Sequence, residues 1–74
     1  MIAMQEILID TEYIKLQELL KLANLVSSGG EAKLLIQNGM ATVNGEVCVQ
    51  RGKKLVPGDV ASLHGHTLKV CHAG

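Results

Sequence analysis

The chain has 74 residues, of which 47% are hydrophobic and 19% charged, and its seven Lys and Arg are balanced by seven Asp and Glu, so it has no net formal charge. This composition fits one small folded domain and excludes a disordered chain, and the absence of Trp and Phe excludes a base-stacking platform built from several aromatic residues. No apolar run approaches the roughly 18 residues of a membrane span, and no signal peptide is recognisable, so we expect a cytoplasmic protein. In that compartment we expect its two cysteines, Cys48 and Cys71, to be small buried or half-buried thiols.

The first expected element is a short edge strand or arm, where Gln5 to Ile9 alternate loosely between polar and apolar residues. Asp10 and Thr11 interrupt this pattern. From Ile14 the period changes, and apolar residues recur at the spacing of one helix face: Leu16, Leu19, Leu20 and Ala23. Further apolar residues widen this surface, so we expect a largely buried helix: Leu22, Leu25 and Val26.

A second helix is predicted over about Gly29 to Asn38. Ser28 and Glu31 have the spacing of a capping box, in which the serine hydroxyl accepts from the Glu31 amide and the carboxylate accepts from the Ser28 amide. Lys33 and Gln37, four residues apart, share one side of this helix. Its expected buried positions are Ala32, Leu35 and Ile36.

After Gly39, which suits the position following a helix, the apolar period becomes two and a strand is predicted over Ala41 to Val43. Asn44-Gly45 is a strong signal for a type I′ hairpin turn, because both central residues of that turn need positive φ. Residues 47–50 alternate as the second strand of the hairpin. They lead into a basic loop, Arg51-Gly52-Lys53-Lys54.

Pro57-Gly58 fits the centre of a type II turn. The last strands are predicted over Val60 to Leu63 and Thr67 to Cys71, joined across His64-Gly65-His66. The order of a strand or arm, two helices and then short strands indicates an α+β fold, with the two helices packed on one side of a small, mostly antiparallel sheet.

The chemistry-bearing residues do not indicate catalysis. Ser27 and Ser28 are explained by helix capping, and no nucleophile has a recognisable base nearby. A zinc site is an alternative, with its possible ligands towards the end of the chain: His64, His66, Cys71 and His72. No Cys-x-x-Cys accompanies them, so turn and terminal histidines are the favoured interpretation, and we expect neither a metal nor another cofactor.

The charges are unevenly distributed although they sum to zero. Residues 1–14 carry three acidic and no basic residues, a local charge of −3: Glu6, Asp10 and Glu12. All seven basic residues lie in residues 15–74, which carry +3. If the basic loop folds beside the glycine-led start of the second helix, whose free amides attract anions, the two form one cationic groove for a phosphate backbone.

Several stretches of the chain occur in an order that is more specific than any one of them: Leu19-Leu20-Lys21-Leu22-Ala23, Ser27-Ser28-Gly29-Gly30-Glu31-Ala32-Lys33, Leu35-Ile36-Gln37-Asn38-Gly39, Val43-Asn44-Gly45-Glu46, and Arg51-Gly52-Lys53-Lys54-Leu55 with Pro57-Gly58-Asp59-Val60. Over residues 14–63 this order resembles the S4 domain, the RNA-binding αL module named after ribosomal protein S4. The second and fifth stretches are most similar to small stand-alone bacterial S4-like proteins. We therefore expect residues 1–13 to form an N-terminal strand or arm, and residues 14–72 an S4-like RNA-binding domain, within one compact unit.

The resemblance implies a non-enzymatic, ribosome-associated protein that binds structured RNA, either ribosomal or transfer RNA. We expect this protein to be a cytoplasmic monomer. The family's RNA-binding positions fall on the start and exposed side of the second helix and on the basic loop: Ser28, Gly29, Gly30, Lys33, Gln37, Arg51, Lys53 and Lys54. Many S4 domains have Arg where Gly29 stands, so one phosphate contact of the family is missing here. The alternative is a ribosome-associated protein-interaction module that uses the acidic arm and makes no direct contact with RNA.

Overall fold

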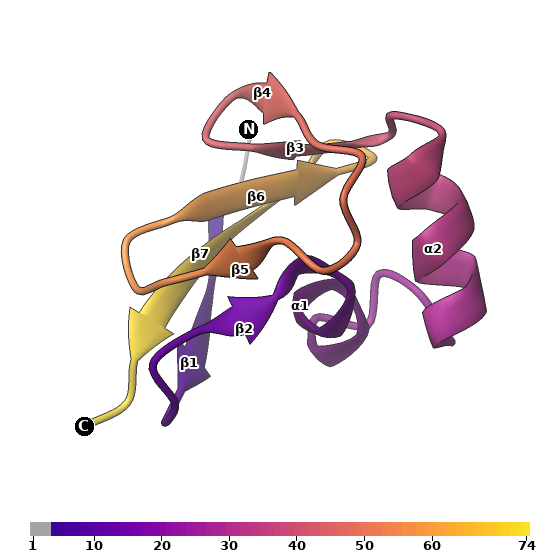
Figure 1. Cartoon of the computed structure of the whole chain (residues 1–74). Helices are drawn as coiled ribbons and strands as arrows, with labels where there is room; N and C mark the ends of the chain where they lie inside the picture. Colours follow the sequence, from indigo (N-terminus) through magenta and orange to yellow (C-terminus); the bar gives the residue numbers. More distant parts are fainter. Residues whose placement is uncertain (1–3) are drawn as a thin grey trace.

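The computed structural model describes residues 4–74, which form two helices and seven strands (Figure 1). The first three residues of the expected N-terminal arm lie outside the described residues. The elements follow one another in the order β1 (Met4–Ile9), β2 (Ile14–Lys15), α1 (Leu16–Leu22), α2 (Gly29–Gln37), β3 (Ala41–Val43), β4 (Glu46–Val47), β5 (Lys54–Leu55), β6 (Val60–Leu63) and β7 (His66–His72).

The strands form two sheets. The larger one has five strands in the order β1-β7-β6-β3-β4, and β2 and β5 form a separate antiparallel pair. In the larger sheet β1 pairs with β7 in parallel and every other pairing is antiparallel. The structure therefore confirms the predicted α+β fold with a mostly antiparallel sheet. Both helices lie on the same side of this sheet and share one core with it (Figure 1).

The core is aliphatic, as the missing Trp and Phe require. Four strands of the larger sheet, β1, β3, β6 and β7, turn alternate residues inwards, which is the period of an extended chain, whereas both residues of β4 are exposed. From the sheet, the core receives Ala41, Ala61, Leu63, Leu68 and Val70, and from the helices it receives Leu16, Leu19, Leu20, Ala32 and Ile36. The predicted helical stripe of α1 is confirmed, whereas Leu35 of α2 is only half-buried.

The acidic N-terminal segment contributes to this core. β1 lies at the edge of the larger sheet and pairs over its whole length with β7, from Met4 opposite Thr67 to Ile9 opposite His72. Ile7 and Ile9 are buried, whereas Leu8 between them is 63% exposed. The alternation predicted for this edge strand is thus present, and β1 shares the core of the remaining elements.

The predicted turns have the expected backbone. Asn44 and Gly45 have φ values of 52° and 87°, as a type I′ turn between β3 and β4 requires. His64 and Gly65, at 53° and 80°, make a turn of the same kind between β6 and β7. At the Pro57-Gly58 turn the Asp59 amide donates to the Val56 carbonyl over 2.9 Å, and Gly58 has a φ of 102°.

Three predictions about the elements are wrong. Residues Ile14 and Lys15 precede the helix as strand β2, because they pair with β5 some 40 residues later in the chain, a contact that local periodicity cannot reveal. Leu22 is 57% exposed, since it lies off the buried face of a seven-residue helix. The strand predicted over residues 47–50 ends at Val47, where pairing with β3 stops.

Neither helix of residues 4–74 is long and apolar enough to cross a membrane.

Candidate nucleic-acid interface

The basic loop, residues 51–54, is fixed to the start of α1 by its backbone. The carbonyls of Arg51 and Lys53 accept hydrogen bonds from the amides of Gln17 over 3.1 Å and Leu16 over 2.9 Å. The first amides of an α-helix have no partner within the helix, so these bonds satisfy two of them. The carbonyls face α1, and the side chains of Arg51, Lys53 and Lys54 are exposed.

A fourth cation lies beside the loop. Lys15 of β2 stands directly opposite Lys54 of β5 in the antiparallel pair. Like charges at directly opposite positions destabilise a sheet, and part of that cost is offset because the Lys54 Nζ lies 4.9 Å from the centre of the Tyr13 ring. We call Lys15, Arg51, Lys53 and Lys54 the cationic cluster. Sequence reasoning missed Lys15, because only the pairing of β2 with β5 brings it to the loop.

The start of α2 is capped by its own residues. The Ser28 Oγ accepts a hydrogen bond from the Glu31 amide over 3.2 Å, as predicted. The Glu31 carboxylate accepts from the Ser27 amide over 2.8 Å, one residue earlier than the Ser28 amide predicted for it. The Ser28 hydroxyl therefore already has a structural role, and the Glu31 carboxylate adds a negative charge close to this helix end.

Neither glycine at this helix start is required by the fold. Gly29 and Gly30 are helical, and their φ values are not positive. A methyl group on Gly29 would meet nothing within 4 Å, and one on Gly30 would meet only the Ser28 Oγ at 3.9 Å. Glycine inside a helix costs up to about 1 kcal/mol relative to alanine. Gly29 and Gly30, the first two residues of α2, therefore leave the backbone of the first turn uncovered although the fold does not need them.

The exposed side of α2 carries the other predicted residues. Positions i, i+3, i+4 and i+7 line up along a helix, and on α2 this exposed line, which we call the outer stripe, consists of Gly30, Lys33, Leu34 and Gln37. Leu34 is 62% exposed, so the stripe combines one cation and one amide with an apolar side chain.

The structure sorts the predicted residues into two groups around α1 (Figure 1). The cationic cluster adjoins the first turn of α1, whereas Ser28, Gly29 and Gly30 follow its last turn after a short connection. The two groups therefore lie at opposite ends of this seven-residue helix. The far end of α2 returns towards β4, since a methyl group on Gly39 would lie 3.6 Å from the Val47 Cγ1. The single cationic groove predicted for the basic loop beside the start of the second helix is therefore wrong, because the length of α1 separates the two. The predicted residues lie instead along the two helices.

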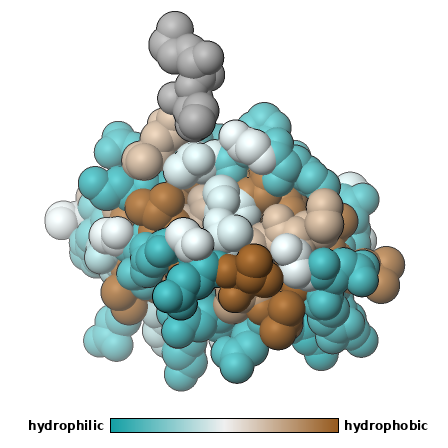
Figure 2. Space-filling model, turned by 90° about the horizontal axis from the view of Figure 1, so that it is seen from above, coloured by the Kyte–Doolittle hydropathy of each residue, from teal (hydrophilic) through white to brown (hydrophobic). Residues whose placement is uncertain are grey.

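Exposed apolar residues lie next to this path. Met40, Val47 and Val49 are 47%, 63% and 54% exposed. Figure 2 looks down on the end of the molecule that carries β3 and β4, and it shows hydrophobic side chains in the middle of this face within a hydrophilic surround. A surface of this kind offers both apolar contact and charge to a partner.

The metal-binding alternative has no cluster to support it in the part of the chain that the structure describes. Among residues 4–74, no three His, Cys, Asp or Glu side chains gather closely enough to hold a metal ion. Cys48 and Cys71 are free and half-buried, as expected.

Comparison with known proteins finds a matching family model and similar proteins. A family model described as "S4 domain" matches residues 7–71. The chain is 46% identical over 57 residues to the Bacillus subtilis protein named "Probable ribosome maturation protein RlbA", covering 77% of this chain and 80% of the relative. It is 36% identical over 58 residues to the Escherichia coli protein named "Putative RNA-binding protein YbcJ", covering 78% of this chain and 83% of the relative.

Two solved structures are similar to this one. The solution structure of YbcJ from E. coli, whose title describes an αL motif involved in RNA binding, matches with a TM-score of 0.67 and 31% identity over 95% of this chain and 87% of that chain. The 30S ribosomal protein S4e from Thermoplasma acidophilum matches with a TM-score of 0.64 and 19% identity over 77% of this chain and 30% of that chain, which shows a shared fold alone. The family model spans both helices, the hairpin and the basic loop, and two relatives above 30% identity cover most of the same residues, so the chain belongs to the S4 domain family.

Proposed function

We propose that this protein binds structured RNA of the ribosome, or transfer RNA, through the cationic cluster and the exposed side of α2. The observation that carries the proposal is the attachment of the basic loop to the first turn of α1, because it presents several cations from a fixed backbone. Preorganised side chains lose less conformational entropy when they meet a ligand. The names of the relatives, which refer to RNA binding and ribosome maturation, support RNA as the polyanion.

The two groups of residues have different roles in this proposal. Lys15, Arg51, Lys53 and Lys54 hold phosphates as point charges or, for Arg51, as a two-pronged donor. The start of α2 offers amides that Gly29 and Gly30 leave uncovered, although Glu31 weakens its attraction for anions. The cationic cluster therefore supplies most of the affinity, and the helix fixes where the backbone runs.

The protein acts as a binding protein without catalysis in this proposal. Its site consists of exposed cations, amides and a helix face, and it includes no nucleophile paired with a base. Since ribosomes are assembled in the bacterial cytoplasm, we propose that it acts there, as a monomer.

The test is a triple substitution. Changing Lys33, Arg51 and Lys54 to Ala is expected to weaken binding to a structured ribosomal RNA fragment at least tenfold. Thermal unfolding is expected to change little, because exposed substitutions away from packing usually alter stability by within about 0.5 kcal/mol. Titration of the RNA by fluorescence anisotropy and thermal unfolding by circular dichroism measure the two quantities.

Lys69→Ala is the matched control. Lys69 lies between the buried Leu68 and Val70 on β7, so it faces the side of the larger sheet that the helices do not cover. This variant is expected to bind RNA like the original chain. Equal losses in the control and in the triple variant would place the binding surface elsewhere. If the protein binds ribosomal proteins but does not bind naked RNA, even at low salt, the protein-interaction module is favoured instead.

A further inference from the structure

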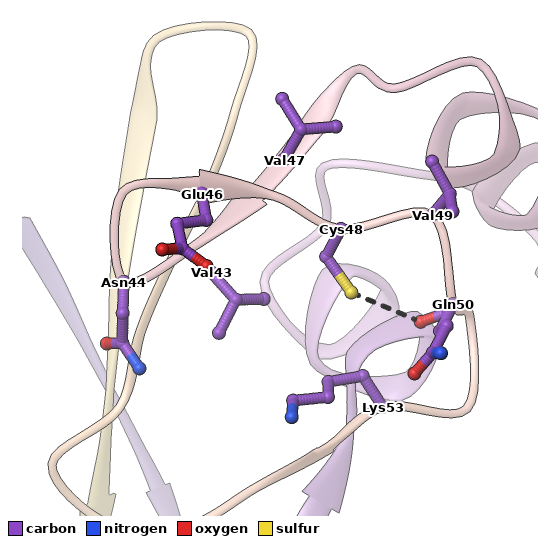
Figure 3. Close-up of a pocket in the computed structure, with 8 residues that line it drawn as sticks. All are labelled: Val43, Asn44, Glu46, Val47, Cys48, Val49, Gln50 and Lys53. Carbon is purple, nitrogen blue, oxygen red and sulfur yellow. Dashed lines mark hydrogen bonds between the residues drawn. The ribbon is translucent and has the colours of Figure 1, made fainter.

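A pocket beside the basic loop is not explained by phosphate binding. It has a volume of about 350 Å³ and lies between the β3–β4 hairpin and the segment that leads to β5 (Figure 3). Val43, which is 9% exposed, and the half-buried Cys48 supply apolar surface. Lys53 belongs both to this pocket and to the cationic cluster, so a ligand of the pocket lies next to any backbone that the loop holds.

The pocket contains polar groups that the fold does not use. The Asn44 amide is engaged, since it donates to Asp59 over 3.2 Å and accepts from the Val60 amide over 3.0 Å. In the described part of the chain, the side chains of Glu46, Gln50 and Lys53 have no hydrogen-bonding partner. Figure 3 shows Lys53 and Gln50 on one side of the space and Glu46 on the other.

The charges of this pocket suit a neutral ligand better than a phosphate. Glu46 carries a negative charge, which repels phosphate, and Lys53 carries a positive charge, which repels an Arg or Lys side chain of a protein. A flat, neutral polar group with hydrogen-bond donors at one end and an acceptor at the other can pair with both the Glu46 carboxylate and the Lys53 ammonium. In RNA the groups of this kind are bases, and those that a protein can reach are unpaired and turned out of the stack.

We propose that this pocket takes one unpaired guanine of the bound RNA, an inference that rests on the proposed function. A carboxylate only accepts hydrogen bonds and an ammonium only donates them. The Watson–Crick edge of guanine offers two adjacent donors, N1–H and the N2 amino group, next to the O6 acceptor. Glu46 accepts the two donors. Lys53, whose ammonium has three donors, gives one to O6 and keeps the others for the neighbouring phosphate.

The other bases fit this pair less well. Adenine and cytosine each place an acceptor beside a single amino donor, and uracil places its one donor between two acceptors. Each of them therefore leaves a Glu46 oxygen facing an acceptor or without a partner. The half-buried Cys48 offers apolar surface to the face of the base, as apolar side chains do for extruded bases.

The test uses RNA hairpins that differ at one bulged nucleotide. The stem stays the same, and the bulged nucleotide is G, A, C, U or inosine, which lacks the N2 amino group of guanine. A sixth hairpin has no bulge. The original chain is expected to bind the G bulge about tenfold more tightly than the A, C or U bulge, within the range of one good base contact. Inosine is expected to lie in between, because it keeps one of the two donors.

Glu46→Gln is the decisive variant. It keeps the shape of the side chain and replaces one acceptor oxygen by a donor, so the preference for G is expected to fall to twofold or less while binding of the hairpin without a bulge is retained. Glu18→Gln removes the same charge from an exposed position on α1 outside the pocket and is expected to keep the preference. Thermal unfolding of both variants verifies that each is folded.

The outcomes separate this inference from the proposed function. Equal binding of all bulges by the original chain, or a G preference that survives Glu46→Gln, overturns the guanine site while RNA binding stands. If the original chain binds neither the RNA hairpins nor a ribosomal RNA fragment at low salt, the proposed function is overturned, and the guanine site with it.

Discussion

Single glycines in this chain fall into two physical classes, and the difference is testable. Gly29 and Gly30 have ordinary helical backbone and open space where a side chain would be, so the fold does not need them. Gly45 has a φ of 87° in the β3–β4 turn, which other residues adopt only with strain. Glycine in the second class is required by a turn, whereas glycine in the first class leaves the backbone of the helix start uncovered.

The double variant Gly29→Ala/Gly30→Ala is expected to stabilise the protein and weaken RNA binding. Each substitution adds up to about 1 kcal/mol of stability, and a domain of this size gains roughly 4–8 °C in Tm per kcal/mol. The new methyl groups keep a phosphate away from the first amides of α2, so RNA affinity falls several-fold. Thermal unfolding and RNA titration measure both effects.

Gly45→Ala is the control with the opposite expectation. It is expected to lower stability by more than about 0.5 kcal/mol, since alanine does not suit a positive φ, and to leave RNA affinity unchanged. If the double variant becomes more stable and binds RNA as before, the helix start is not part of the interface.

At the scale of the elements, short-range sequence patterns were sufficient to predict each element that is stabilised by its own residues. The Ser28 cap, the period of α2 and the Asn44-Gly45 turn each act over a few residues, and each was predicted. The pairing of β2 with β5 is different, because it joins Ile14 to Leu55 and no short-range pattern marks it. Lys15 and the attachment of the basic loop to α1 depend on that pairing, so this half of the candidate interface could not be derived from the sequence.

One side chain of the β3–β4 turn bonds to the start of β6, in addition to the antiparallel pairing of β3 with β6, and this leads to a prediction about stability. Asn44 donates to Asp59 and accepts from the Val60 amide, and it has a φ of 52°. Asn44→Ala removes both hydrogen bonds and adds backbone strain, so we expect a loss of about 2 kcal/mol or more. Urea unfolding measures it.

Asn44→Gly separates the two causes. Glycine tolerates the positive φ and lacks only the side-chain hydrogen bonds, so it is expected to cost less than the alanine variant. Equal losses in the two variants would show that strain at this position is negligible. Affinity of either folded variant for the RNA without a bulge is expected to stay within about twofold, because Asn44 acts on the β3–β4 turn and not on the phosphates.

At the scale of the whole molecule, the distribution of charge matters more than its sum. Glu6, the one acidic residue of β1, lies at one edge of the larger sheet, whereas the cationic cluster lies at the start of α1. A field at the surface depends on nearby charges, since salt screens those more than about 10 Å away at 0.1 M. The uneven charge was visible in the sequence, but which cations stand together was not, because chain folding brings Lys15 next to Lys54.

This view predicts that the salt dependence of RNA binding follows the local cations and not the net charge. With five phosphate contacts, from Lys33 and the cationic cluster, the logarithm of affinity is expected to fall with the logarithm of salt concentration at a slope of about −3 to −5. Arg51→Gln is expected to make that slope shallower by about one, since one contact is lost. Affinity measured from 50 to 300 mM salt gives the slope.

Glu6→Lys tests whether net charge, rather than the local cations, sets the salt dependence of RNA binding. It raises the net charge of the chain from zero to +2 at an exposed position on β1, away from the cationic cluster. If local cations set the response, this variant keeps the slope of the original chain even though its net charge changes by twice as much as in Arg51→Gln. If the overall charge set the response instead, the slope would steepen for Glu6→Lys about twice as much as it becomes shallower for Arg51→Gln, and the cationic cluster would then not be the contact surface.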